Sequence, residues 1–198
     1  MKILLNGRHG KVGSVLGPGL EAAGHTLVDG LDDSDAMVDF TRPDAAAGNV
    51  RAAVDAGVPC VVGTTGWDTA EFEHAPVTVF YAPNFAIGAV LMMRFAAEAA
   101  RHLDRAEIVE LHHLGKLDAP SGTAKLTAAQ MGGDVPIHSV RLPGLNAHQE
   151  VILGGAGQTL TIRHDALSRE AYTAGVLLAL EKLNELPPGL TIGLDALL

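Results

Sequence analysis

Cysteine, aromatic residues and long apolar runs are scarce in this chain of 198 residues. A single cysteine, Cys60, excludes an internal disulfide framework and a zinc site built from several thiolates. No run approaches the roughly 18 apolar residues that span a bilayer. The apolar residues that follow Met1 form too short a run for a secretory signal peptide. We therefore expect a soluble, cytoplasmic protein.

Positive charge is also in deficit, since 14 Lys and Arg residues stand against 23 Asp and Glu residues, for a formal net charge of −9. Without a basic cluster, the chain has no positive field for binding nucleic acid. Aromatic residues make up only 4% of the chain, whereas hydrophobic residues as a whole make up 47%. The sequence therefore predicts a folded domain with a largely aliphatic core.

Short apolar segments alternate with helical segments through the first half of the chain. The expected strands are residues 2–6, 25–29, 36–41, 58–62 and 77–81, and the expected helices are residues 13–23 and 44–56. Strands of this kind, bounded by Gly or Pro and alternating with helices, are typical of a parallel, doubly wound sheet. Only six residues separate positions 29 and 36, too few for a crossover helix between neighbouring parallel strands.

The pattern changes in the second half of the chain. The expected helices are residues 88–103 and 172–186, and the expected strands are residues 107–111, 137–142, 149–153 and 159–163. Polar and apolar residues alternate in the last strand, which indicates a sheet with one wetter face. The sequence thus predicts an α/β, Rossmann-type domain at residues 1–86 that is completed by residues 169–198. An α+β substrate-binding domain with a mixed sheet is expected between them, at residues 87–168.

A glycine-rich loop, Gly7–Gly13, joins the first expected strand to the first helix with the spacing G-x-x-G-x-x-G. Glycines allow a pyrophosphate to approach the backbone, and the helix N-terminus favours the anion. Asp29 ends the second strand, near the position from which a carboxylate binds the adenosine ribose. This carboxylate favours NADH, whereas Arg8 and Lys11 would attract the 2′-phosphate of NADPH, so both cofactors stay open. The alternative is an ordinary turn with a solvated Asp.

Two more candidate loops follow expected strands. Gly63-Thr64-Thr65-Gly66 comes after the fourth strand, and Ala82-Pro83-Asn84-Phe85 comes after the fifth. Ligands of open α/β sheets bind beyond the carboxyl ends of the strands. On local evidence alone both segments are also compatible with ordinary turns. Cys60 lies inside a strand, where we expect a buried and unreactive thiol.

The segment Glu110–Ala124 contains the most candidate catalytic side chains. Ser121 is a favoured N-cap, so a helix should begin there and direct the backbone amides of Gly122 and Thr123 outward, toward a carboxylate or phosphate. The ammonium group of Lys116 adds a positive charge. This combination suits an anionic substrate.

Two adjacent histidines, His112 and His113, precede this helix. An imidazole can donate a proton near neutral pH. A metal site is disfavoured, because neighbours on a strand face opposite sides and no third ligand has a suitable spacing. A solvated histidine pair near a structural Lys116 is the alternative.

The segment Glu110-Leu111-His112-His113-x-x-Lys116-x-Asp118-Ala119-Pro120-Ser121-Gly122-Thr123-Ala124 resembles the signature of the dihydrodipicolinate reductase (4-hydroxy-tetrahydrodipicolinate reductase) family. Further stretches match that family in order: the glycine loop, Asp39–Pro43, Val62–Gly66, Ala82–Gly88 and Leu160–His164. The resemblance covers nearly the whole chain. This chain is nevertheless shorter than is usual in the family, with compressed segments at residues 30–35, 67–76 and 124–135.

The resemblance implies an NAD(P)H-dependent reductase of lysine and diaminopimelate biosynthesis. It would reduce dihydrodipicolinate, a cyclic unsaturated dicarboxylate, to tetrahydrodipicolinate. It also implies a homotetramer assembled through the sheet of the substrate domain. From charge, apolar run length and ligand spacing we expect no nucleic-acid, membrane or metal partner. The implied cofactor-binding residues are Gly7, Arg8, His9, Gly10, Lys11, Val12, Asp29, Gly63, Thr64, Thr65, Ala82, Pro83, Asn84 and Phe85. The catalytic residues would be His112, as proton donor, and Lys116, and the substrate contacts His113, Lys116, Ser121, Gly122 and Thr123.

Two other functions are compatible with parts of this pattern. A non-catalytic NAD(P)H-binding module that senses redox state needs the glycine loop and Asp29, but it has no use for the combination of His112, Lys116 and Ser121–Thr123. A semialdehyde dehydrogenase needs a cysteine nucleophile after a strand, and Cys60 has the wrong setting for that role.

Overall fold

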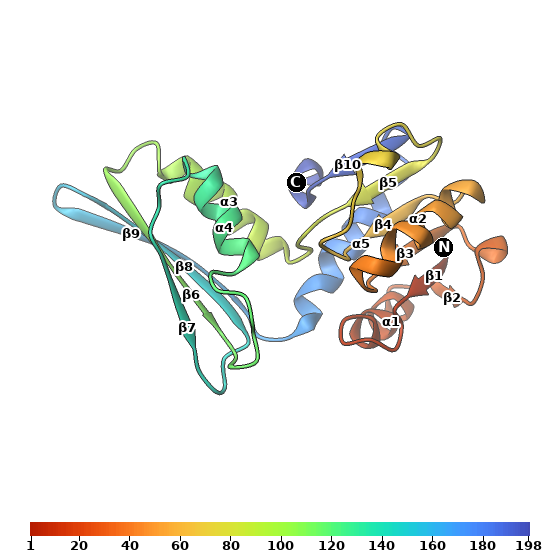
Figure 1. The fold of residues 1–198 in the computed structure, drawn as a ribbon, viewed down its shortest axis with the longest axis horizontal. Coiled ribbons are helices and arrows are strands. Elements are labelled where there is room, and N and C mark those ends of the chain that lie inside the picture. Colours follow the sequence, from red (N-terminus) through yellow and green to blue (C-terminus); the bar gives the residue numbers. More distant parts are fainter. The chain divides into compact units, whose positions relative to one another are not determined.

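Six parallel strands form the sheet of the first unit, which comprises Met1–Ile87 and Arg169–Leu198 of this computed structural model. The structure describes residues 1–198. The strands are β1 (Lys2–Asn6), β2 (Thr26–Val28), β3 (Ala36–Asp39), β4 (Cys60–Val62), β5 (Thr78–Tyr81) and β10 (Gly189–Ile192). Their order is β10-β5-β4-β3-β1-β2, and every neighbouring pair is parallel (Figure 1). The doubly wound sheet expected from the sequence is thereby confirmed.

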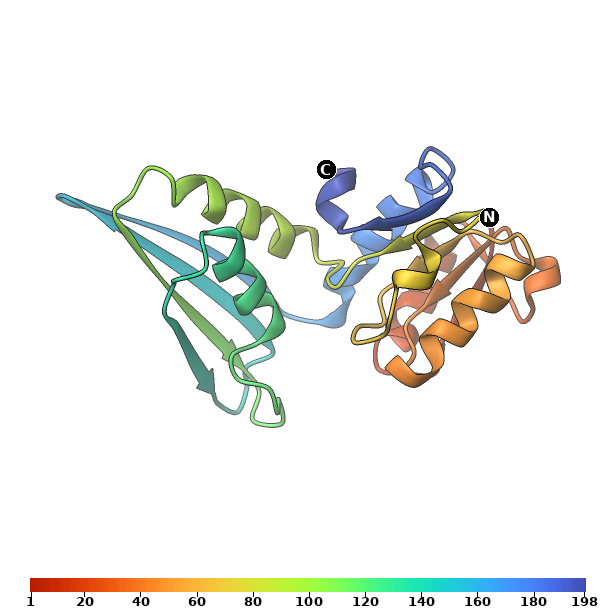
Figure 2. The same ribbon diagram turned by 45° about the horizontal axis from the view of Figure 1, so that its top comes forward.

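Three α-helices and four 3₁₀ turns accompany this sheet. They are α1 (Gly13–Ala22), α2 (Pro43–Asp55), α5 (Thr173–Lys182), η1 (Leu31–Asp33), η2 (Ala70–Phe72), η3 (Arg169–Tyr172) and η4 (Leu194–Leu197). The closing helix, expected over 172–186, begins at Thr173 and ends at Lys182. Figure 2 shows the C-terminal segment, in dark blue, running beside the yellow β5.

The local sequence does not indicate β10, a strand of only four residues that follows Pro187 and Pro188. Its register pairs Gly189 with Thr78 and Ile192 with Tyr81. The two prolines before the strand and Gly189 at its start are residue types that favour turns. Its strand conformation therefore depends on pairing with β5. A tertiary contact therefore overrides the local preference.

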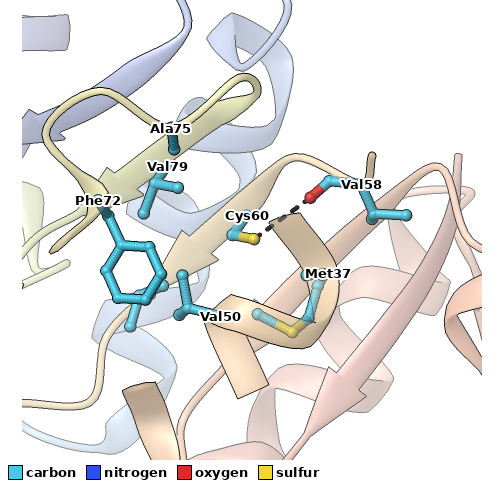
Figure 3. Packing of buried hydrophobic residues seen from close by; sticks show 9 residues of the cluster. Met37, Val50, Val58, Cys60, Phe72, Ala75 and Val79 are labelled. Carbon is cyan, nitrogen blue, oxygen red and sulfur yellow. Dashed lines mark hydrogen bonds between the residues drawn. The ribbon is translucent and has the colours of Figure 1, made fainter. Parts of the chain in front are cut away.

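A cluster of buried side chains packs α2 and η2 against one face of the sheet (Figure 3). It consists of Met37, Val50, Ala53, Val58, Cys60, Phe72, Val62, Ala75 and Val79. Phe72 is the only aromatic residue among the nine, as the low aromatic content predicts. The thiol of Cys60 is buried and lies 3.4 Å from the carbonyl oxygen of Val58. Burial, with the nearby Asp39 carboxylate, raises the pKa of this thiol to about 12, so Cys60 is the unreactive thiol that we expected.

The short connection between β2 and β3 contains η1 and no α-helix. Strands β2 and β3 pair with opposite edges of β1, so this connection must cross β1 within a few residues. Leu31 in η1 packs against the buried cluster. Asp35 anchors the end of the connection, since its carboxylate accepts a hydrogen bond from the backbone amide of Lys2 at 2.7 Å.

The second unit, Gly88–Ser168, has a mixed four-stranded sheet and two helices. The elements are α3 (Ile87–Ala99), β6 (Arg105–His112), α4 (Gly122–Gln130), β7 (Ile137–Arg141), β8 (Ala147–Gly155) and β9 (Gln158–Ala166). The strand order is β7-β6-β8-β9, in which only β6 and β7 are parallel. Helix α3 ends at Ala99, four residues before the predicted end. The mixed sheet is as predicted.

Alternate residues of β8 show which face of this sheet is covered. Gln149, Val151 and Leu153 are buried, whereas the residues between them are partly exposed. Glu110 and Ile108 of β6 point to the same side as these residues and are fully buried. The covered side of the sheet therefore carries both apolar residues and a carboxylate. No helix of the protein is both long and apolar enough to cross a membrane.

The first testable prediction concerns the close approach of α1 to the preceding loop. A Cβ at Gly13 would lie 2.1 Å from the carbonyl oxygen of Gly7 and 2.7 Å from its carbonyl carbon. Because both are backbone atoms, we expect Gly13→Ala to lower the free energy of unfolding by about 1–3 kcal/mol. Gly48→Ala in α2 is the matched control, because nothing lies within 4 Å of its Cβ, and it should stabilise by about 0.5–1 kcal/mol. Urea unfolding measures both, and equal midpoints for the two variants would contradict the prediction.

Candidate functional site

The carboxyl ends of four neighbouring strands lie at one edge of the parallel sheet. Three backbone hydrogen bonds continue the pairing just past the strands: Phe40 to Asn6 (3.1 Å), Gly63 to Asp39 (2.9 Å) and Ala82 to Val62 (3.1 Å). The loops that follow β1, β3, β4 and β5 are therefore held side by side at this edge. This is the edge at which ligands bind in open α/β sheets.

The glycine loop after β1 is built for a close backbone approach. Gly7 has a φ of +83°, a conformation that favours glycine. The amide of Gly10 donates to the carbonyl of Gly7 at 2.8 Å, and a Cβ at Gly10 would lie 3.1 Å from that same oxygen. No side chain caps α1, and its first turn contains no acidic residue. An uncapped helix N-terminus behind a glycine loop fits the pyrophosphate of a dinucleotide.

The groups that would meet the adenosine end are accessible. Asp29 directly follows β2 and is exposed. Lys11 is exposed too, and Arg8 is only weakly paired, 3.8 Å from Glu21. A carboxylate and two cations are thus all available, so the geometry is compatible with both NADH and NADPH.

A buried carboxylate that the sequence analysis did not single out joins two of the loops. Asp39, at the end of β3, has no solvent exposure. It accepts hydrogen bonds from the amide (3.2 Å) and hydroxyl (2.8 Å) of Thr41, from the hydroxyl of Thr64 (2.6 Å) and from the side chain of Asn49 (2.7 Å). The Thr64 hydroxyl also accepts from the amide of Thr41 at 2.7 Å. This network fixes the loop after β3 to the loop after β4.

Aromatic packing fixes the third loop. The ring of Phe40 covers Gly63, where a Cβ would lie 2.2 Å from the ring. The same ring lies 5.5 Å from the buried ring of Phe85, which follows β5. The carboxamide oxygen of Asn84 accepts from the amide of Ala86 at 2.9 Å. Gly63 and Phe85 therefore have structural roles next to the cofactor roles predicted for them.

In the second unit, Glu110 and His112 point to the same side of β6. Glu110 is fully buried, and its carboxylate lies 2.5 Å from Nδ1 of His112. Burial lowers the pKa of His112, as do the charges of Lys116 and Arg141, while the Glu110 carboxylate opposes this shift. The pKa of His112 in the free protein therefore lies below the ordinary value of a histidine.

Arg141, the last residue of β7, makes two hydrogen bonds to the Glu110 carboxylate, at 2.8 and 2.7 Å. The backbone amide of Ser121 donates to the same carboxylate at 3.3 Å. Burial disfavours the charged form of Glu110, but the hydrogen bonds from Arg141, Ser139 and His112 outweigh it and lower the pKa of Glu110 to about 2. The sequence pointed to neither Arg141 nor the role of Glu110, because Arg141 is 31 residues away and nothing local connects them.

Lys116 and the start of α4 complete this site. The ammonium group of Lys116 lies 2.8 Å from the Asp118 carboxylate, and its side chain is mostly buried. Ser121 is the N-cap of α4, as predicted, and its hydroxyl accepts from the amide of Ala124 at 3.2 Å. Because Ser121 is 2% exposed, its side chain serves the helix. The exposed Gly122 and the half-buried Thr123 supply the free first-turn amides.

The predicted site residues thus fall into two sets, one in each unit. Hydrogen bonds and ion pairs bring together Glu110, His112, Arg141, Asp118, Lys116 and Ser121 in the second unit. His113 is exposed and is not part of this network. No group of three or more His, Cys, Asp or Glu side chains is placed to hold a metal ion.

A Rossmann-type dinucleotide domain, joined to a unit that presents an imidazole, an ammonium group and a helix N-terminus, defines a nicotinamide-dependent reductase. Two family models match the chain, "Dihydrodipicolinate reductase, N-terminus" over residues 18–85 and "Dihydrodipicolinate reductase, C-terminus" over residues 88–198. The chain belongs to the dihydrodipicolinate reductase family.

Relatives support this assignment over the full length. A 4-hydroxy-tetrahydrodipicolinate reductase of Mycolicibacterium gilvum is 41% identical over 243 aligned positions, which cover 100% of this chain and 99% of the relative. One from Desulfitobacterium hafniense is 48% identical over 211 positions, 89% of this chain and 79% of the relative. A solved structure, dipicolinate-bound dihydrodipicolinate reductase from Paenisporosarcina sp. TG-14, superposes with a TM-score of 0.86 at 30% identity, covering 100% and 99% of the two chains.

The second testable prediction concerns the Asp39 network. Asp39→Asn replaces an acceptor oxygen by an amide that faces other donors, so the free energy of unfolding should fall by about 1–3 kcal/mol. The dissociation constant for NADH should also rise, because the loops after β3 and β4 lose their common anchor. Urea unfolding and a fluorescence titration with NADH measure the two effects.

Asp44→Asn is the control, since Asp44 is exposed and pairs only with the exposed Arg42. It should change stability by less than about 1 kcal/mol and leave NADH binding unchanged. If Asp39→Asn loses stability but binds NADH normally, the network does not position the cofactor loops.

Proposed function

We propose that this chain reduces dihydrodipicolinate (4-hydroxy-tetrahydrodipicolinate) to tetrahydrodipicolinate, a reaction of lysine and diaminopimelate biosynthesis, with NADH or NADPH. The observation that carries this proposal is the site around His112: an imidazole bound to a buried carboxylate, with Lys116 and the first turn of α4 on the same short connection. A dinucleotide-binding sensor has no need for this arrangement. The names of relatives that match along the whole chain support the same reaction.

The cofactor would bind along the carboxyl edge of the parallel sheet. Residues Gly7–Val12 would hold its pyrophosphate, and Asp29 its adenosine ribose. Residues Gly63–Thr65 and Ala82–Phe85 would line the nicotinamide end. The bound dinucleotide supplies the hydride that reduces the substrate ring.

The second unit would bind the two carboxylates of the substrate. Lys116 provides a full positive charge, and the amides of Gly122 and Thr123 provide donors at a helix N-terminus. His113 is exposed beside them and is a further contact implied by the family resemblance. Since Lys116 is paired with the exposed Asp118 at the surface of this loop, a substrate carboxylate can replace that partner.

His112 would provide the proton. Its Nδ1 is bound to Glu110, so Nε2 is the nitrogen that can face the substrate. Hydride addition leaves negative charge on the ring, which a positioned acid neutralises, a step worth roughly 10²–10⁴-fold in rate. Two substrate carboxylates beside His112 favour its protonated form and counteract the lowered pKa of the free protein.

We also propose that the protein is a homo-oligomer, and by family resemblance a homotetramer assembled through the four-stranded sheet. The face of that sheet turned away from the buried Gln149, Val151 and Leu153 is only partly covered within one chain. It thus has the surface that such an assembly needs.

The third testable prediction concerns turnover with freshly generated dihydrodipicolinate. His112→Gln should lower kcat by at least about 100-fold with little change in the dissociation constant for NADH, because it removes the proton donor. Lys116→Ala should lower kcat and also raise KM for the substrate. Steady-state oxidation of NADH measures both.

Lys125→Ala in α4 is the matched control for Lys116→Ala, because Lys125 is exposed and lies beyond the first turn of the helix. It should leave both constants nearly unchanged. Near-normal turnover in the His112 and Lys116 variants would contradict the proposal, and NADH binding without turnover in the wild type would favour the redox sensor.

The fourth testable prediction concerns the choice of cofactor. Asp29→Ser removes the carboxylate that repels a 2′-phosphate, while Arg8 and Lys11 stay in place. The ratio of kcat/KM for NADPH to that for NADH should therefore rise. Asp32→Ser is the control, since Asp32 lies in η1 on the same exposed connection. An unchanged ratio in Asp29→Ser would exclude the role proposed for Asp29.

A further inference from the structure

We infer that Glu110 is a positioning residue for the proton donor: its buried carboxylate fixes the tautomer and orientation of His112. The inference rests on the proposed function, since the proton donor is His112. It goes further, because Glu110 touches neither solvent nor any surface that a substrate can reach.

The cost of burying Glu110 is the first reason. A carboxylate without solvent contact is strongly destabilising unless charges and donors compensate it. Donors from four residues converge on Glu110: the guanidinium of Arg141, the side chain of Ser139, the amide of Ser121 and Nδ1 of His112. Ile108 lies two residues before Glu110 on the same covered side of the sheet and is equally buried. An apolar residue is therefore sufficient where the role is purely structural.

The effect on His112 is the second reason. A carboxylate at Nδ1 accepts a hydrogen bond from Nδ1–H, so the neutral ring keeps its proton on Nδ1 and its lone pair on Nε2, where it takes up the catalytic proton. The charged groups around the ring are Glu110, Asp118, Lys116 and Arg141, and of the two carboxylates Glu110 is the one hydrogen-bonded to the ring. Without Glu110, burial and the two cations would lower the pKa of His112 further.

The connection to the substrate-binding groups is the third reason. The same carboxylate accepts the amide of Ser121, whose hydroxyl caps α4. Arg141 also donates to the backbone carbonyl of Asp118 at 2.8 Å, and Asp118 pairs with Lys116. One ion pair thus holds the imidazole, the ammonium loop and the helix N-terminus in a common frame.

The test, our fifth prediction, is Glu110→Gln, which keeps the size of the side chain. We expect kcat to fall about 10- to 100-fold, part of the benefit of a positioned acid, with KM for the dicarboxylate changing much less. Because a general acid must be protonated, kcat/KM should fall as pH rises through the pKa of His112. This descending part of the pH profile should move to lower pH in Glu110→Gln, since the carboxylate that raises the pKa of His112 is gone.

Two controls separate positioning from stability. Glu98→Gln removes an exposed carboxylate of α3 that pairs with His102 and Arg101, and it should leave the rate and the pH profile unchanged. In a His112→Gln background, Glu110→Gln should cause almost no further loss of rate, because Glu110 acts through His112. Equal losses in both backgrounds, or a pH profile that does not move, would overturn the inference in favour of a structural role.

An NMR titration of the His112 ring in the free protein gives a readout that does not need turnover. The nitrogen shifts should show Nδ1 protonated in the neutral wild-type ring, and the pKa should drop in Glu110→Gln. Glu110→Asp should recover part of that drop. If the wild type lacks reductase activity but these shifts appear, the proposed function fails while the positioning stands. If activity is present but the shifts are absent, the positioning alone fails.

Discussion

The compensation of one buried carboxylate organises the second unit of this protein. Glu110 is shielded from water, so the polypeptide has to bring a guanidinium, an imidazole and a backbone amide to it. These groups come from β7, β6 and the start of α4. Because these three groups meet at one carboxylate, they fix the parallel pairing of β6 with β7 and the residue at which α4 begins. The imidazole and the free amides of the proposed site are positioned by the same requirement.

In the first unit, neutral hydrogen-bond donors compensate a second buried carboxylate. Asp39 is equally buried, but hydroxyl, amide and carboxamide groups surround it, from Thr41, Thr64 and Asn49. Such a site ties two loops together, and the titratable group that its charge affects is the unreactive thiol of Cys60. Glu110 instead faces an imidazole and a guanidinium, and its charge matters for the chemistry as well as for the fold. The two carboxylates therefore differ in function because their partners differ in charge.

The short length of the chain is accommodated without loss of this framework. Between β2 and β3 a 3₁₀ turn takes the place of a helix, and Leu31 reaches the core cluster from it. Relatives align with the whole chain and with nearly their own full length, over more positions than this chain has residues. The strands that carry Asp39, Glu110 and Arg141 are all present in this shorter chain.

The sequence by itself determined the class of fold, the parallel sheet, the cap at Ser121 and the candidate residues His112 and Lys116. These follow from local properties: period, turn residues and capping chemistry act over a few positions. The tertiary structure alone decided that β10 forms, that Asp39 anchors two loops, and that Arg141 meets Glu110. Each of these features depends on contacts between residues that are far apart in the chain. Burying such polar groups is favourable only when they meet their partners, so no local sequence pattern predicts them.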